Sequence, residues 1–171
     1  MKLKLFGAAL FGVLAMSSCS VETELNEITM DSQTFLFEDI YEGSNSATIE
    51  MDSEAMIDAQ ESLDSKEIES IFISGVTLTK NDSIGLSEIT SSKLQIMSES
   101  EDLPMVTVAV KTEVAEGVNS IELDVIDDVD LKEYMDNGKI YLVLDANFSV
   151  DNEMEQPVEA VVKFAFNTAK K

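Results

Sequence analysis

The chain has 171 residues and a formal net charge of −23, and it contains neither histidine nor tryptophan. Its acidity argues against binding to DNA or RNA, because phosphates are neutralised by clustered lysines and arginines. The lack of histidine excludes a Ser-His-Asp triad and every zinc or iron site built on imidazole, so no enzyme is expected. Hydrophobic residues make up 44% of the chain, which is enough to predict a folded domain despite the charge.

The N-terminal stretch has the pattern of a secretory signal. Lys2 and Lys4 form a basic start, an apolar run covers residues 5–16, and two small serines precede Cys19. A transmembrane helix needs about 20 apolar residues, so this run is too short to span a bilayer. Residues 1–18 are therefore predicted to be a signal peptide.

The residues around this cleavage point also resemble a known motif. Met16-Ser-Ser-Cys19 is similar to the lipobox of bacterial lipoprotein precursors, in the relaxed, serine-rich form of the Bacteroidota. The usual box has Leu first and Gly or Ala before the cysteine, where this chain has Met and Ser. The resemblance implies that Cys19 is acylated and anchors the protein to a membrane of the cell envelope, the outer membrane being expected. It leaves open whether the protein faces the periplasm or the surface.

The mature chain is predicted to have two parts. Residues 19–33 comprise the lipidated cysteine and a short acidic tether, because the stretch shows no sustained periodicity. Residues 34–171 are predicted to form one domain, since their number suits a single hydrophobic core. Cys19 is the chain's only cysteine, so no intramolecular disulfide is expected.

The first half of this domain shows strand periodicity with one helical interruption. Phe35, Phe37 and Tyr41 share one parity and predict a strand with inward aromatic side chains. Residues 43–46 are predicted to be a turn. A strand over residues 47–51 and a short helix over residues 53–63 are expected to follow.

The next two strands are expected at residues 67–80 and 92–97. In the first of them Ile71 and Ile73 share one parity, whereas Val76 and Leu78 share the other. A β-bulge at Ser74-Gly75 would produce this change of phase. A strand buried on both faces is the alternative, because Phe72 lies between the two isoleucines.

The second half alternates more cleanly and predicts four strands joined by turns. Asp130-Leu-Lys-Glu133 matches a capping box, which predicts a short helix ending before Gly138. The inward positions of the four strands are Val106, Val108, Val110 and Val114; Ile121, Leu123 and Val125; Ile140, Leu142, Leu144, Ala146, Phe148 and Val150; and Val158, Ala160, Val162, Phe164 and Phe166.

These segments together predict an all-β protein with about eight strands and two short helical connections. One-sided alternation is typical of antiparallel sheets that bury one face and expose the other. We therefore expect a two-sheet antiparallel β-sandwich, immunoglobulin-like with Greek-key connections. A closed barrel would show the same alternation and stays open.

Three weaker candidate sites lie in this domain. Asp124, Asp127, Asp128 and Asp130 form an acidic loop whose carboxylates are of the kind that binds calcium, although turn and capping roles are expected more often. Tyr141 is on the outward parity of its strand and is the one tyrosine expected to offer a platform for a sugar ring. Asp82-Ser83-Ile84 resembles the acceptor for O-glycosylation of exported Bacteroidota proteins, which implies a glycan on Ser83.

The sequence thus favours a lipid-anchored envelope protein whose β-sandwich is a non-catalytic binding or structural module. Its partner would be a protein or a glycan. One alternative is a fimbrial subunit or adhesin, because such subunits in the Bacteroidota are also lipidated β-sandwich proteins. A second alternative is a glycan hydrolase, which requires two catalytic carboxylates. Among 34 acidic residues, some pair always has a suitable spacing, so spacing alone does not identify such a site.

Overall fold

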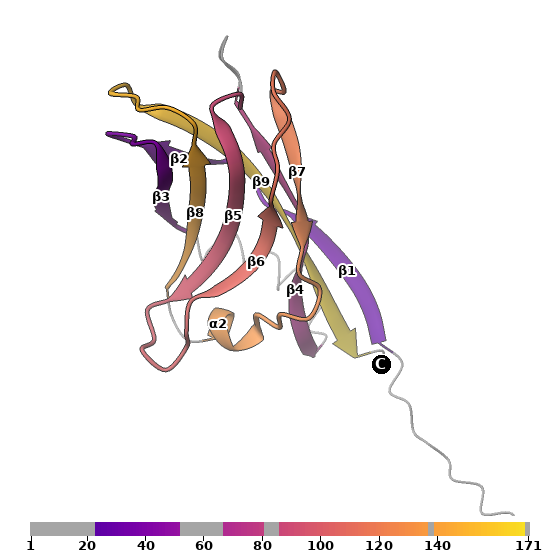
Figure 1. The fold of residues 1–171 in the computed structure, drawn as a ribbon. Helices are drawn as coiled ribbons and strands as arrows, with labels where there is room; N and C mark the ends of the chain where they lie inside the picture. The colour runs from indigo at the N-terminus through magenta and orange to yellow at the C-terminus, as the bar shows by residue number, and fades with distance from the viewer. Residues whose placement is uncertain (1–22, 52–66, 81–85, 137–138, 170–171) are drawn as a thin grey trace, which may run out of the picture.

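A computed structural model describes residues 23–51, 67–80, 86–136 and 139–169 of the chain (Figure 1). Within these residues the backbone forms nine strands and one short helix. They are β1 (Thr23–Thr29), β2 (Gln33–Phe37), β3 (Gly43–Glu50), β4 (Ile68–Thr79), β5 (Ile89–Ser98), β6 (Val106–Lys111), β7 (Ser120–Val125), α2 (Lys132–Asp136), β8 (Ile140–Phe148) and β9 (Gln156–Ala169).

The strands pair in a nested order. β5 pairs with β6, β4 with β7, β3 with β8 and β2 with β9, and every pairing is antiparallel. The chain thus behaves as one long hairpin that has been rolled up, which brings β5 beside β8 and β4 beside β9. This double Greek key is the topology of a jelly roll.

Two layers result from the rolling, as Figure 1 shows. One layer contains β1, β2, β9, β4 and β7, and the other contains β3, β8, β5 and β6. β7 pairs with β4 over four residues and with β6 over two, so the layers are joined along this strand. The expected two-sheet antiparallel sandwich is confirmed. Its strand order is that of a jelly roll, which replaces the finer expectation of an immunoglobulin-like order.

The core lies between the two layers and is supplied by alternate residues of the strands. β9 contributes most clearly, because its inward side chains Val158, Ala160, Val162, Phe164 and Phe166 have no exposed surface. Complete burial stabilises a large apolar side chain by about 1.5–3 kcal/mol. The inward parity expected for this strand is therefore confirmed.

The N-terminal part of the domain differs from the expectation. Thr23–Thr29 is strand β1, which pairs with β9, so the expected acidic tether is wrong for these residues. Its side chains are mostly exposed, and a strand without a buried face gives no hydrophobic alternation in the sequence. Gly43 to Ser46 belongs to β3 and is not a turn.

Tyr41 also differs, because its side chain is 70% exposed and does not point inward. β2 ends at Phe37, and Asp39 has a left-handed φ of 47°, which interrupts the extended backbone before Tyr41. The parity of Phe35 and Phe37 therefore does not extend to Tyr41.

Two local predictions are confirmed. The register of β4 against β9 shifts between Ile73 and Gly75, where the bulge is expected. The helix after Asp130 forms as α2. The helix expected over residues 53–63 lies outside the described residues. In the described part of the chain, no helix has the length and apolar character needed to cross a membrane.

Candidate functional site

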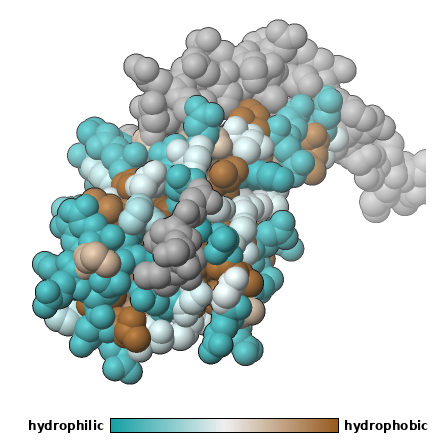
Figure 2. Space-filling view, turned by 90° about the horizontal axis from the view of Figure 1, so that it is seen from above, coloured by the Kyte–Doolittle hydropathy of each residue, from teal (hydrophilic) through white to brown (hydrophobic). Residues whose placement is uncertain are grey.

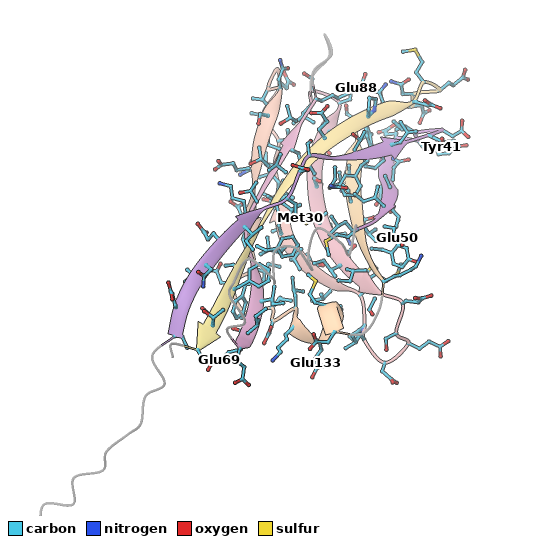
Figure 3. All side chains as sticks on the ribbon, turned by 180° about the vertical axis from the view of Figure 1, so that it is seen from behind. Met30, Tyr41, Glu50, Glu69, Glu88 and Glu133 are labelled. Atoms are coloured by element: carbon cyan, nitrogen blue, oxygen red, sulfur yellow. The ribbon has the colours of Figure 1, made fainter. Side chains whose placement is uncertain are left out.

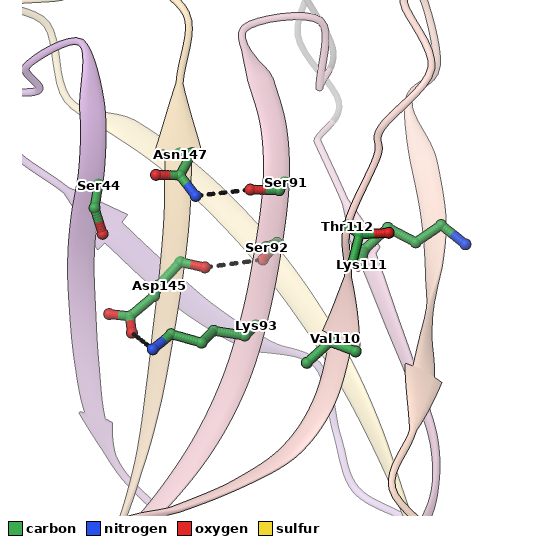
Figure 4. Close-up of a pocket in the computed structure, with 9 residues that line it drawn as sticks. All are labelled: Ser44, Ser91, Ser92, Lys93, Val110, Lys111, Thr112, Asp145 and Asn147. Carbon is green, nitrogen blue, oxygen red and sulfur yellow. Dashed lines mark hydrogen bonds and ion pairs between the residues drawn. The ribbon is translucent and has the colours of Figure 1, made fainter.

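A shallow groove lies on the outer face of the layer formed by β3, β8, β5 and β6 (Figure 4). Its volume is 290 Å³, close to the lower end of the range for ligand pockets, about 300 Å³. We call it the strand groove. It is lined by Ser44, Ser91, Ser92, Lys93, Val110, Lys111, Thr112, Asp145 and Asn147.

Asp145 occupies the centre of the strand groove and links three strands. It pairs in register with Ser46 of β3 and with Lys93 of β5. The Ser46 hydroxyl donates a hydrogen bond to Asp145 Oδ1, and Lys93 Nζ lies 3.0 Å from Oδ2. Each carboxylate oxygen therefore has a protein donor, which fixes its orientation while lone pairs remain for further donors.

A second set of hydrogen bonds runs beside the first, closer to one end of the same strands. Asn147 Nδ2 donates to Ser91 Oγ over 2.7 Å, and the Asn147 carbonyl accepts from Thr90 Oγ1 over 3.2 Å. Ser92 Oγ donates to the Asp145 carbonyl over 3.1 Å, and its residue is only 5% exposed. Hydroxyl, amide and carboxylate groups are thus held in fixed positions on adjacent strands (Figure 4).

This arrangement is suited to hydrogen bonding and lacks an activated nucleophile. A serine nucleophile needs a base within hydrogen-bond reach. Ser92 instead donates its proton to a backbone carbonyl, while the Lys93 ammonium faces the Asp145 carboxylate. The two side chains project from adjacent positions of one strand, so they do not form a Ser-Lys dyad. The groove can therefore bind a polar ligand through groups that are already ordered.

The four aspartates of the expected calcium loop have separate positions. Asp124 lies 3.7 Å from Lys111 Nζ as an ion pair on the sheet surface. Asp127 and Asp128 are exposed in the turn before α2. Among the described residues, no group of three or more acidic or cysteine side chains is placed to hold a metal ion. Calcium binding at this loop stays a prediction.

Asp130 is the one member of that loop with several protein partners. Its Oδ1 accepts hydrogen bonds from the backbone N–H groups of Lys132 and Ile71, both over 3.0 Å. The first of these bonds is the cap predicted from the sequence, and it satisfies a free donor of α2. The second bond attaches the start of α2 to β4. The expected capping role of Asp130 is therefore confirmed.

Among the described residues, the remaining predicted site residue, Tyr141, does not line the strand groove. Tyr141 is half-buried on β8, in register with Glu50 of β3 and Met97 of β5. This is the position of a residue that packs across strands, and its role as a sugar platform stays a prediction. Cys19 and Ser83 lie outside the described residues, so lipidation and glycosylation also stay predictions.

A second hollow, missed by the sequence reasoning, lies between the β2–β3 and β8–β9 loops. Its volume is 470 Å³, and Tyr41 and Asn152 are among its lining residues. The loops are joined by two backbone hydrogen bonds between Ile40 and Asn152, of 3.0 and 2.9 Å. The exposed ring of Tyr41 stands at this hollow. Its parity with Phe37 gave the opposite expectation, so the alternation of residues could not reveal it.

The strand groove itself was also missed. Most of its residues are hydroxyl, amide and charged side chains of β3, β5, β6 and β8, which by themselves resemble any solvated strand face. Val110, which was expected to point inward, also lines the groove, because the register of β5 against β6 shifts next to Ala109. The face seen in Figure 2 is likewise mostly hydrophilic, with small scattered hydrophobic areas. The sequence signal that could have revealed the groove is the density of serines at residues 87–92. That signal becomes informative only when the pairing of β5 with β8 is known.

Comparison with known proteins gives no family. No family model matches the chain, and no curated protein matches it. Among solved structures, the chain is similar to "Structure of infectious bursal disease virus Gx strain", with a TM-score of 0.42, 13% identity, and coverage of 96% of this chain and 37% of that one. It is also similar to "Structure of Triatoma Virus (TrV)", with a TM-score of 0.38, 11% identity, and coverage of 98% and 76%. The chain thus spans 37% of the length of the first viral chain.

Proposed function

We propose that this chain is a lipid-anchored protein of the cell envelope whose jelly-roll domain is a non-catalytic binding module. The anchor is Cys19, which follows an apolar run and resembles the lipidated cysteine of Bacteroidota lipoproteins. Acylation would supply the attachment, because a chain with 34 acidic and 11 basic residues is poorly suited to electrostatic binding of anionic lipids. The binding function is inferred from the strand groove.

The observation that carries the proposal is the ordered polar network of the strand groove. Asp145 is oriented by Ser46 and Lys93, and Asn147 is bonded to Ser91. Polar groups fixed on rigid strands lose little freedom on binding, so their hydrogen bonds to a ligand are made at low entropic cost. Such a row of donors and acceptors matches a ligand that presents several hydroxyl groups, and a saccharide is the class that fits.

The charge of the chain selects among saccharides. The protein carries a net charge of −23 and repels anionic ligands at long range. The Lys93 ammonium is paired with Asp145 at 3.0 Å, so it does not offer an uncompensated positive charge to an acidic sugar. A volume of 290 Å³ suits one sugar unit at a time. We therefore expect a neutral sugar, recognised through its hydroxyl groups.

A titration with a panel of neutral oligosaccharides, followed by amide chemical shifts, tests this proposal. We expect shifts that cluster at Ser91, Asp145 and Asn147. Asn147→Ala removes one amide from the groove and should weaken the affinity for a binding saccharide by about tenfold, the equivalent of one charge-free hydrogen bond of about 1.4 kcal/mol. The exposed position of Asn147 makes the variant compatible with folding.

Thr48→Ala provides the matched control, because Thr48 is exposed on β3 of the same layer and does not line the groove. Its affinity should equal that of the wild type. Absence of binding by every saccharide of the panel would contradict the proposed ligand class. Equal affinities for Asn147→Ala and the control would place the binding site elsewhere on the domain.

A further inference from the structure

β1 and β2 pair with the same strand but are held in different ways. β2 lies against the first part of β9, and its Phe35 and Phe37 are 0% and 2% exposed. β1 lies against the last part of β9, Lys163–Ala169, and none of its side chains is buried. β2 is therefore fixed by the core, whereas β1 is held mainly by backbone hydrogen bonds. Figure 1 shows β1 running along β9 at the margin of its layer.

β1 makes few side-chain contacts, and each of them depends on its register against β9. Ile28 is half-buried against the core, whereas Leu25 is 62% exposed. Asn26 Nδ2 donates to Thr168 Oγ1 over 3.1 Å, and Thr168 Oγ1 donates to the Glu24 carbonyl over 3.3 Å. These bonds set the register of β1 on β9. Because little apolar surface is buried, this pairing belongs to the least stable part of the sheet.

The residue that follows β1 is held by the core. Met30 is 6% exposed, and its backbone N–H donates to the Val162 carbonyl over 3.0 Å. Figure 3 labels Met30 at the point where β1 meets the rest of the layer. The buried Met30 side chain fixes the chain there while β2 stays in place. Rotation at Thr29 would therefore release β1 from β9 with the loss of the Ile28 contact, while Met30 and β2 stay held.

We propose that β1 is exchanged between two copies of this protein, so that β1 of one copy pairs with Lys163–Ala169 of another. Release of β1 exposes the backbone N–H and C=O groups of a sheet edge, which accepts another strand. A second copy is the matching occupant, because its β1 carries the Asn26 and Ile28 side chains that fit Thr168 and the core. The exchange re-forms the same seven-residue ladder, so the paired strand loses no contact.

Disulfide formation between two copies that carry different cysteine substitutions tests this exchange. All variants are full chains that also carry Cys19→Ala, which removes the only native cysteine. One copy carries Leu25→Cys and the other Asn167→Cys, because these positions face each other across β1 and β9. After mixing at an ionic strength that screens the acidic surfaces, oxidation should yield a covalent dimer on a non-reducing gel.

β2 provides the matched control. Thr34 and Glu159 face each other across β2 and β9, and both are exposed. A mixture of Thr34→Cys and Glu159→Cys copies should give at least tenfold less dimer, since Phe35 and Phe37 keep β2 in its own core. Each pair placed in a single chain should cross-link internally, which confirms that the geometry permits a disulfide.

Two results would overturn the proposal. The first is a Leu25→Cys and Asn167→Cys mixture that stays monomeric although the same pair cross-links within one chain. The second is an equal yield of dimer from the β1 and β2 mixtures, which would indicate random collision or global unfolding. Neither result depends on whether the strand groove binds a saccharide.

Discussion

At the scale of single residues, several polar side chains of this protein bind backbone groups or link neighbouring strands. Asp130 bonds two backbone N–H groups from different elements, and Asp145 joins side chains of β3 and β5. Tyr134 is 7% exposed, and its hydroxyl donates to the Pro104 carbonyl over 2.6 Å. The abundant acids are therefore not equivalent, and a few have defined structural roles.

Tyr134 gives a prediction at this scale. Desolvation of its ring, with a smaller contribution from Glu133, raises the pKa of Tyr134 above 10.0. A folded-state pKa above the unfolded value means that Tyr134 contributes stability below pH 10 that is lost as the pH rises through the folded pKa. Phenolate absorbance of the wild type minus that of Tyr134→Phe should show a midpoint above 10.0. A midpoint at or below that value would contradict the burial of this hydroxyl.

At the scale of elements, α2 is a short helix whose start is attached to β4 through backbone and side-chain hydrogen bonds. The Leu131 N–H donates to the Ile71 carbonyl over 2.7 Å, and Lys132 Nζ donates to the Ile68 carbonyl over 2.7 Å. Leu131 has no exposed surface. A helix of five residues is too short to be stable alone, so these contacts with β4 determine its position.

The attachment of α2 can be tested through its cap. Asp130→Ala removes the acceptor of two backbone N–H groups and should lower the free energy of unfolding by about 1–2 kcal/mol. Asp128→Ala is the matched control, since it removes the same charge from an exposed position of the same loop, and its effect should stay within about 0.5 kcal/mol. Urea denaturation measures both. Equal effects of the two variants would mean that charge, and not the cap, is responsible.

Some elements could be predicted from the sequence and others could not. Strands with one buried face, such as β9, follow from alternation, and the Asp130 cap follows from local spacing. β1 does not, because most of its side chains are exposed and backbone pairing produces no hydrophobic alternation in the sequence. Tyr41 was misplaced because the left-handed conformation of Asp39 cannot be read from neighbouring parity. The strand groove depends on which strands become neighbours, and that choice is made by the whole fold.

At the scale of the whole molecule, the nested pairing produces two layers joined along β7, with a core between them and a polar outer face. The outer face of the β3–β8–β5–β6 layer carries the strand groove, while β1 at the margin of the other layer is the proposed exchange element. The proposed ligand and the proposed second copy would therefore engage different layers of the domain.

Partitioning between detergent and aqueous phases, after expression in a Bacteroidota host, is the most direct test of the central claim that this domain is carried on a lipid anchor. The wild type should enter the detergent phase, whereas Cys19→Ala should stay in the aqueous phase because it has no thiol to acylate. Ser20→Ala changes the adjacent residue and should partition like the wild type. Detergent partitioning of Cys19→Ala equal to that of the wild type would contradict the account.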